Sequence, residues 1–231
     1  MGRTALLDTT DEAVAGIEDG STVLVGGFGL AGMPFDLIDA LIRQGARDLT
    51  IVSNNAGNGD VGLAALLRAG RVRKVVCSFP RQVDSYVFDE LYLSGRLELE
   101  VVPQGNLAER MRAAAAGIGA FYSPTAVGTP LAEGKESRVI DGREYLLEYP
   151  IKGDYALIAA HRADRLGNLV YRKTARNFGP VMAAAATTTI VQVGSVAPTG
   201  ALDPEAVVTP CIYVDRVVAV EQRHYTVQGA R

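Results

Sequence analysis

Short aliphatic runs alternate with longer segments whose apolar residues recur at helical spacing through the first half of the chain. Thr9 and Glu12 have the spacing of a capping box, which predicts a first helix near residues 11–18. Aliphatic runs predict strands near residues 22–26, 49–53, 72–77 and 97–102. Helical spacing predicts helices at residues 35–44, 61–69, 83–93 and 107–116. Aliphatic strands joined by helical crossovers are typical of a mostly parallel sheet with helices on both faces.

The second half of the chain has a stronger strand pattern. Residues 117–134 are rich in glycine, proline and small side chains, so we expect an ordered loop or insertion there. Further strands are predicted at residues 138–140, 145–148, 155–159, 169–171, 188–193 and 212–214. Asp141-Gly142, between the first two of these, indicates a hairpin. No repeat or linker interrupts the pattern, so one α/β domain with a more β-rich C-terminal half is expected over residues 1–231.

A glycine-rich turn follows the first predicted strand. Gly26 to Gly32 lead into Met33 and Pro34, which open the next predicted helix, and proline suits the first helical turn because it lacks an N–H group. Glycine allows backbone angles and close approaches that a Cβ would block. Such a turn presents N–H groups and the positive end of a helix dipole to an anion or a polarised oxygen. We therefore expect a ligand site here.

The same turn matches the dinucleotide-binding pattern, as Gly27-x-Gly29-x-x-Gly32. That pattern also needs an acidic residue at the end of the next strand, about 20 positions on, to hold the ribose. The next predicted strand ends in Asn54, whereas Asp48 lies at its beginning. A nucleotide-binding dehydrogenase subunit is therefore kept only as an alternative.

Composition narrows the class of protein further. The chain has 231 residues, of which 48% are hydrophobic and 21% charged, with a net charge of −3, which gives no case for nucleic-acid binding. No run reaches the roughly 18 apolar residues of a membrane span, and the first residues lack the apolar core of a signal peptide. Cys77 and Cys211 have no metal-binding or disulfide spacing, so a cytoplasmic location is expected.

The sequence contains no recognisable hydrolase motif and no obvious pair of nucleophile and general base. No G-x-S-x-G motif occurs, and neither His161 nor His224 has an obvious nucleophile near it in the sequence. We interpret both histidines as surface or structural groups, since a general base needs a positioned partner. Cys77 ends a predicted strand and is interpreted as a buried, inert thiol.

The glycine turn and the segments after it resemble the A (alpha) subunits of class I CoA-transferases. The matching signature is Asp19-Gly20, an aliphatic run, Gly26-Gly27-Phe28, Gly32 and Pro34. Further matching blocks are residues 53–57, 102–110, 121–125, 131–135, 167–169, 175–178, 208–210 and 213–215, in the family order. The resemblance covers about residues 10–220. Cys211 departs from it, because a glycine is expected after Thr209-Pro210, and this puts the local turn in doubt.

The resemblance implies a covalent reaction with a glutamate nucleophile. In this family the glutamate attacks an acyl-CoA to form a mixed anhydride, which CoA thiolate converts to an enzyme thioester, and an acceptor carboxylate then takes the CoA. The family's glutamate lies in the B (beta) subunit, in an E-x-G-x-x-G or Ser-Glu-Asn-Gly context, and no glutamate of this chain has that context. The chain therefore resembles half of an enzyme. A B-subunit partner, an A2B2 heterotetramer, CoA or acyl-CoA as substrate and no tightly bound cofactor are the implied properties.

The family's pocket residues have counterparts in this chain. By resemblance, the CoA-binding loop is formed by Gly26, Gly27, Phe28, Gly29, Leu30, Ala31 and Gly32. Asn54, at a predicted strand end, and Gln104, at the end of the fourth predicted strand, match residues that contact the reacting acyl group. The alternatives are a tight turn without a ligand for the loop and an Asx turn for Asn54.

The segment from Ser78 to Tyr86 is similar to subunits that act on 3-oxoadipate and departs from acetoacetate-type enzymes. Arg81 within it could clamp the second carboxylate of succinate or 3-oxoadipate, although a solvated surface arginine is the more common situation. The expected activity is CoA transfer from succinyl-CoA to 3-oxoadipate in aromatic-acid breakdown. Transfer to acetoacetate or another 3-oxoacid, and a non-catalytic acyl-CoA-binding module, are the alternatives.

Overall fold

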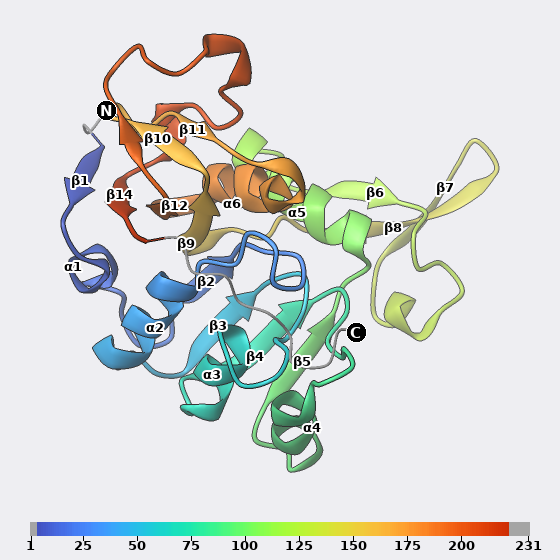
Figure 1. The fold of residues 1–231 in the computed structure, drawn as a ribbon. Helices are drawn as coiled ribbons and strands as arrows, with labels where there is room; N and C mark the ends of the chain where they lie inside the picture. Colours follow the sequence, from blue (N-terminus) through green and yellow to red (C-terminus); the bar gives the residue numbers. More distant parts are fainter. Residues whose placement is uncertain (1–3, 222–231) are drawn as a thin grey trace.

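A twisted sheet of eight parallel strands forms the centre of the computed structural model, which describes residues 4–221 (Figure 1). The strand order is β1-β14-β12-β9-β2-β3-β4-β5, and every pair in this sheet is parallel. Its strands are β1 (Ala5–Leu7), β2 (Thr22–Val25), β3 (Leu49–Val52), β4 (Val72–Cys77), β5 (Glu98–Val101), β9 (Gly153–Ala160), β12 (Ala186–Val193) and β14 (Arg216–Ala219). This confirms the predicted fold class.

Helices cover both faces of this sheet. One face carries α1 (Thr10–Val14), α2 (Phe35–Gln44), α3 (Leu63–Arg68) and α4 (Tyr86–Leu93), and the other carries α5 (Gln104–Ala116) and α6 (Gly179–Ala185). Successive residues of β2 divide between the two cores: Val23 and Val25 pack with α1 and α2, whereas Leu24 packs with α5 and α6. Strands covered on both faces are continuous apolar runs, which is why aliphatic runs located them in the sequence.

The first helix has the predicted capping box but is short. Thr9 Oγ1 accepts a hydrogen bond from the backbone N–H of Glu12, and the Glu12 carboxylate accepts one from the Thr9 N–H, at 3.2 and 3.3 Å. The helix ends at Val14 rather than extending to residue 18. Helix α2 has the predicted bounds, but Pro34 is its N-cap residue and not part of its first turn.

Several elements of the C-terminal half differ from prediction. Residues 212–214, expected as a strand, belong mainly to a 3-10 turn (Cys211–Tyr213), and the strand follows as β14. Ile212 is 58% exposed, so its apolar side chain does not signal burial in a sheet. Helix α6 was missed because its small residues leave little helical periodicity. Two further small strands, β10 (Arg162–Asp164) and β13 (Val196–Ala197), were also missed, while β11 (Leu169–Val170) was predicted.

A three-stranded antiparallel arm projects from one side of the molecule (Figure 1). It consists of β6 (Phe121–Ser123), which lies inside the predicted loop, β8 (Arg143–Glu148) and β7 (Ser137–Ile140). Asp141 and Gly142 connect β7 to β8 with φ of 48° and 76°, as a two-residue hairpin turn of the predicted kind requires.

Buried polar contacts fasten the arm to helix α5. Glu148 of β8 is 2% exposed and accepts hydrogen bonds from Asn106 Nδ2 at 3.0 Å and from Lys135 Nζ. Ser123 Oγ of β6 donates to Asn106 Oδ1 at 2.9 Å. Removing one member of a buried, hydrogen-bonded charge pair leaves the other charge uncompensated, and such losses reach about 3–5 kcal/mol.

We therefore expect Glu148→Ala to loosen the arm selectively. Amide hydrogen exchange in β7 and β8 should accelerate more than exchange in the central sheet, together with a lower free energy of unfolding. Glu98→Ala is the matched control, because Glu98 forms an exposed ion pair with Arg73 and such pairs contribute little. Equal exchange changes in the arm and the central sheet would contradict this assignment.

Candidate functional site

The glycine turn, Asn54 and Gln104 all lie at one edge of the central sheet. Strands β2, β3, β4 and β5 are adjacent and parallel, so the segments that follow them emerge at the same edge. Open parallel sheets bind their ligands at this carboxyl edge.

The structure brings two of the predicted site residues into direct contact. Gln104 Nε2 donates a hydrogen bond to Asn54 Oδ1 at 2.7 Å, although the two residues are 50 positions apart. Asn54 is 2% exposed, whereas Gln104 is exposed. Gln104 was expected at a strand end, but it is the first residue of helix α5, three positions before the predicted helix start.

A third residue, which the sequence reasoning did not single out, completes this cluster. Ser78 Oγ donates to Asn54 Oδ1 at 2.8 Å and lies 3.1 Å from the Asn54 backbone oxygen. Ser78 comes directly after β4, which lies beside β3, and it opens the segment whose sequence is similar to 3-oxoadipate subunits. We call Asn54, Ser78 and Gln104 the amide cluster. Its side chains are uncharged donors and acceptors, suited to a developing negative charge on oxygen.

The Asx turn considered for Asn54 is formed by its neighbour instead. Asn55 Oδ1 accepts a hydrogen bond from the Gly57 N–H at 2.9 Å, which is the Asx-turn contact. The Asn54 carboxamide oxygen is engaged by the amide cluster, and its Nδ2 group makes no hydrogen bond among residues 4–221. Asn54 therefore has a free donor at the sheet edge.

The glycine turn is tight and satisfies part of its own backbone. The Gly26 N–H donates to the Leu157 carbonyl oxygen, and the Gly27 N–H donates to Asn177 Oδ1. The N–H groups of Phe28 and Ala31 each donate to the carbonyl oxygen of the other residue across the turn. Asn177 Nδ2 returns a hydrogen bond to the Ala31 oxygen at 2.8 Å, so this side chain clamps the turn from both sides. Among the described residues, the N–H groups of Gly29, Leu30 and Gly32 have no partner, and these are fewer donors than the sequence led us to expect.

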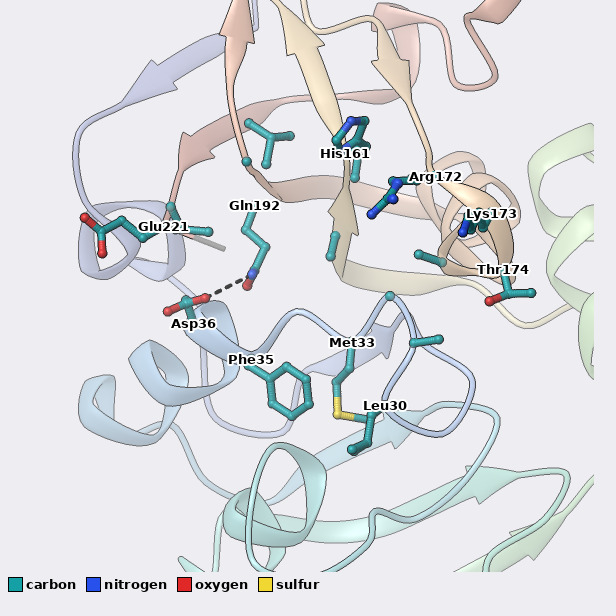
Figure 2. Close-up of a pocket in the computed structure, with 18 residues that line it drawn as sticks. Leu30, Met33, Phe35, Asp36, His161, Arg172, Lys173, Thr174, Gln192 and Glu221 are labelled. Carbon is teal, nitrogen blue, oxygen red and sulfur yellow. Dashed lines mark hydrogen bonds between the residues drawn. The ribbon is translucent and has the colours of Figure 1, made fainter. Parts of the chain in front are cut away.

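The start of helix α2 is also not a free anion site. The Leu37 N–H donates to Gln192 Oε1 at 3.1 Å, and Gln192 Nε2 donates to Asp36 Oδ2 at 3.1 Å (Figure 2). A glutamine from β12 thus caps the helix, and the carboxylate of Asp36 already occupies the positive end of its dipole.

A cavity of about 460 Å³ opens on the other side of the glycine turn (Figure 2). Leu30, Met33 and Phe35 line it below, while His161, Arg172 and Lys173 line it from the opposite side. Arg172 and Lys173 form no ion pair with any described residue, but Asp36 and Glu221 also line the cavity, so its wall carries charges of both signs. Neither the amide cluster nor Arg81 lines it.

Arg81 lies in the exposed segment after β4 and does not touch the amide cluster. Its Nε group donates to both carboxylate oxygens of Asp89, at 2.9 and 3.2 Å, and its side chain is 66% exposed. This hydrogen bond raises the pKa of the Arg81 guanidinium above its usual value. Its two terminal amino groups make no hydrogen bond with a described residue.

The remaining candidates are engaged elsewhere. Cys77 is fully buried, and burial raises the pKa of its thiol to about 12 against the lowering effect of a backbone hydrogen bond from Phe79, which agrees with an inert thiol. Cys211 has no positive φ and donates its N–H to Asn168 Oδ1, so no glycine is required there. His224 lies outside the described residues.

Glu148 and Asp164 are the buried carboxylates of residues 4–221, and both are held by structural hydrogen bonds.

The central sheet thus carries uncharged hydrogen-bond donors at its carboxyl edge, while the two buried carboxylates of residues 4–221 are held by hydrogen bonds to other groups. The family model for coenzyme A transferase matches residues 7–220. The chain belongs to the coenzyme A transferase family.

Relatives and a solved structure agree with this assignment. The chain is 71% identical over 208 residues to the A (alpha) chain of the 3-oxoadipate CoA-transferase of Pseudomonas putida, covering 90% of each chain. It is 62% identical to the chain of the same name from Acinetobacter baylyi, covering 92% of this chain and 93% of the relative. The acyl-CoA transferase YdiF of Escherichia coli O157:H7 superposes with a TM-score of 0.84 at 27% identity, over 94% of this chain but only 47% of YdiF. The chain thus spans about half of that protein.

Two further observations concern membrane-spanning helices and the dinucleotide-binding pattern. No helix between residues 4 and 221 combines the length and apolar character needed to cross a bilayer. Asp48 lies before β3 with a φ of 55°, at the opposite edge from the glycine turn, so the acidic residue of a dinucleotide site is missing from its place.

Gly32 offers a direct test of the turn's packing. It has a φ of 74°, and a Cβ there would lie 2.4 Å from the backbone oxygen of Ala175. Gly29 has a φ of 59° but open space around it. We expect Gly29→Ala to lower the free energy of unfolding by about 1 kcal/mol through its backbone angle alone, and Gly32→Ala to lower it by clearly more. Chemical denaturation of both variants would measure this, and equal losses would contradict the close packing.

The two cysteines should differ in reactivity. Because the pKa of Cys77 is raised to about 12, its thiol stays protonated and unreactive at pH 8. We expect a disulfide reagent such as DTNB to modify one thiol of the native chain at pH 8 and two after denaturation. Cys211→Ser should abolish the native reaction, because Cys211 is partly exposed. Rapid reaction of two native thiols would overturn the buried, inert assignment of Cys77.

Proposed function

We propose that this chain is the A (alpha) component of a succinyl-CoA:3-oxoadipate CoA-transferase that works in aromatic-acid breakdown. The observation that carries the proposal is the contact between the Asn54 and Gln104 carboxamides at the carboxyl edge of the sheet, 2.7 Å apart. Relatives with this activity in their names, at 71% and 62% identity, support the choice of substrate.

The reaction requires stabilisation of a tetrahedral oxyanion. A glutamate carboxylate of the partner attacks the thioester carbonyl carbon of succinyl-CoA. The C–S bond then breaks, CoA departs as its thiolate, and a mixed anhydride between succinate and the glutamate is formed. The thiolate then attacks the glutamyl carbonyl and releases succinate, and 3-oxoadipate takes the CoA by the reverse steps. The free Nδ2 group of Asn54 donates to the oxyanion in this scheme. A neutral donor does so without forming an ion pair that would weaken the glutamate nucleophile.

In this proposal the nucleophile comes from a second chain. Glu148 and Asp164, the buried carboxylates of residues 4–221, are already held by hydrogen bonds away from Asn54. The half-length match to YdiF fits an enzyme divided between two chains. The partner that we propose is a B (beta) chain, which carries the glutamate, and the assembly that we propose is an A2B2 heterotetramer.

The glycine turn binds CoA in this proposal. The N–H groups of Gly29, Leu30 and Gly32, which no described residue accepts, face thioester or pantetheine oxygens. The other N–H groups of the turn hold it in shape. The neighbouring cavity has Arg172 and Lys173 on one side, where an anionic group of CoA could pair with them, and Asp36 and Glu221 elsewhere in its wall.

Arg81 supplies substrate selectivity. Asp89 holds its Nε group and leaves the two terminal amino groups for the second carboxylate of succinate or 3-oxoadipate.

We also propose that residues 1–231 act as one domain, since β1 and β14 pair within one sheet, and that the protein works in the cytoplasm, where its two free thiols stay reduced.

The test is co-expression of the chain with the B subunit of a 3-oxoadipate enzyme, followed by assays of CoA transfer from succinyl-CoA to 3-oxoadipate and to acetoacetate. We expect activity only in the mixture, with preference for 3-oxoadipate. Arg81→Ala should raise KM for 3-oxoadipate about tenfold, through loss of a charge-assisted hydrogen bond. Arg96→Ala, which removes an arginine from a comparable exposed pair with Glu90, should leave KM unchanged.

Each outcome has a separate meaning. Preference for acetoacetate would keep the family and overturn the substrate. Activity of this chain alone would overturn the divided site, and an unchanged KM in Arg81→Ala would overturn the role of Arg81. Acyl-CoA binding without activity in the mixture would indicate a non-catalytic binding module.

A further inference from the structure

The orientation of the Asn54 carboxamide depends on Ser78. The Asn54 oxygen accepts two hydrogen bonds, from Ser78 Oγ at 2.8 Å and from Gln104 Nε2 at 2.7 Å. Because a carboxamide is planar, fixing its oxygen between two donors also fixes the direction of its nitrogen. The Nδ2 group is then directed away from both neighbours, as the free donor at the sheet edge.

We propose that Ser78 is a positioning residue that holds Asn54 with its nitrogen toward the reacting acyl oxygen; this inference rests on the proposed CoA-transfer function. Ser78 acts through Asn54 and does not itself contact the substrate. A rotation of the carboxamide by half a turn would place an oxygen where the oxyanion forms, and the repulsion between the two oxygens would oppose the reaction.

Ser78 is better suited than Gln104 to this task. Gln104 has a long, exposed side chain at the start of a helix, and ordering it costs conformational entropy. Ser78 is partly buried, and a single side-chain torsion sets the position of its oxygen. Its backbone is also fixed by hydrogen bonds. The N–H groups of Ser78 and Phe79 both donate to the Asn54 backbone oxygen, at 3.2 and 3.1 Å. The hydroxyl is thereby placed beside the carboxamide by the ends of two adjacent strands.

The hydroxyl also orients the amide without adding charge. A lysine or arginine at this position would donate equally well to the Asn54 oxygen. Its positive charge would attract the incoming carboxylate nucleophile and hold it in an ion pair. A serine keeps the cluster neutral, so the carboxylate meets donors only where charge develops on the acyl oxygen.

The sharpest test compares Ser78→Thr with Ser78→Val in the co-expressed complex. The two side chains have the same shape and differ only in the hydroxyl, so any packing disturbance is shared. We expect kcat of the valine variant to be lower than that of the threonine variant by about 3-fold to 10-fold, the rate equivalent of one lost neutral hydrogen bond. The KM for succinyl-CoA should be similar in both. Ser94→Ala, which removes an exposed serine hydroxyl just after α4, serves as the control with unchanged activity.

A double-variant cycle separates positioning from a structural role. In the Asn54→Ala background, Ser78→Thr and Ser78→Val should have equal kcat, because the carboxamide that the hydroxyl orients is gone. A threonine-to-valine difference that persists in this background, or equal kcat in the presence of Asn54, would overturn the inference while leaving the proposed function intact. Absence of CoA transfer in the unmodified complex would instead overturn the proposed function.

A second measurement does not depend on activity. The side-chain amide signals of Asn54 in a nitrogen-15 spectrum of the full chain can be assigned by their loss in Asn54→Asp. We expect these signals to shift or broaden in Ser78→Val relative to Ser78→Thr, with no change in Ser94→Ala. Identical Asn54 signals in the threonine and valine variants would show that the hydroxyl does not hold the carboxamide.

Discussion

Parallel pairing of the central strands is the constraint on which the rest of the molecule depends. Because β9, β2, β3, β4 and β5 all run in one direction, the segments that follow them meet at a single edge. Burial on both faces fixes this pairing: Val23 and Leu24 enter opposite cores, so a slip of one residue would exchange the two sets of side chains. Residues as distant in sequence as Asn54 and Gln104 therefore meet without any local signal that joins them.

Much of the fold was visible in the sequence because this sheet is buried. The bounds of β4 and α2 were predicted without error, since continuous aliphatic runs and amphipathic spacing reflect burial directly. Prediction failed where an apolar residue is exposed, or where a buried element is made of small residues. Ile212 is apolar and exposed, and the strand lies a few residues later in β14. Helix α6 is buried through small residues and glycine, whose contribution comes from close packing rather than from periodicity.

The positions of the candidate site residues in the fold were predictable, but their hydrogen-bond partners were not. Strand ends and the family resemblance located Asn54 and Gln104, and parallel topology implied that they approach one another. The partners of each polar group could not be read in the same way. Asn177 and Gln192, which clamp the glycine turn and cap α2, come from segments about 150 residues away. Ser78 became visible only once β3 and β4 were adjacent, because its role lies in a hydrogen bond and not in a spacing.

Two exposed aromatic side chains lie at the same edge of the sheet as Asn54. Phe28 belongs to the turn after β2 and Phe79 to the segment after β4, so they flank the end of β3 where Asn54 lies, and they are 51% and 61% exposed. A mixed anhydride survives only where water is excluded, and a half-site cannot exclude water by itself. A partner that brings its carboxylate to Asn54 must cover this edge, and it would bury both phenylalanines as it does so. Aromatic side chains of this kind dominate the energetics of protein interfaces. Within the proposed function, the exposed rings and the missing nucleophile are thus two consequences of one fact, that the carboxyl edge of this sheet is completed by a second chain.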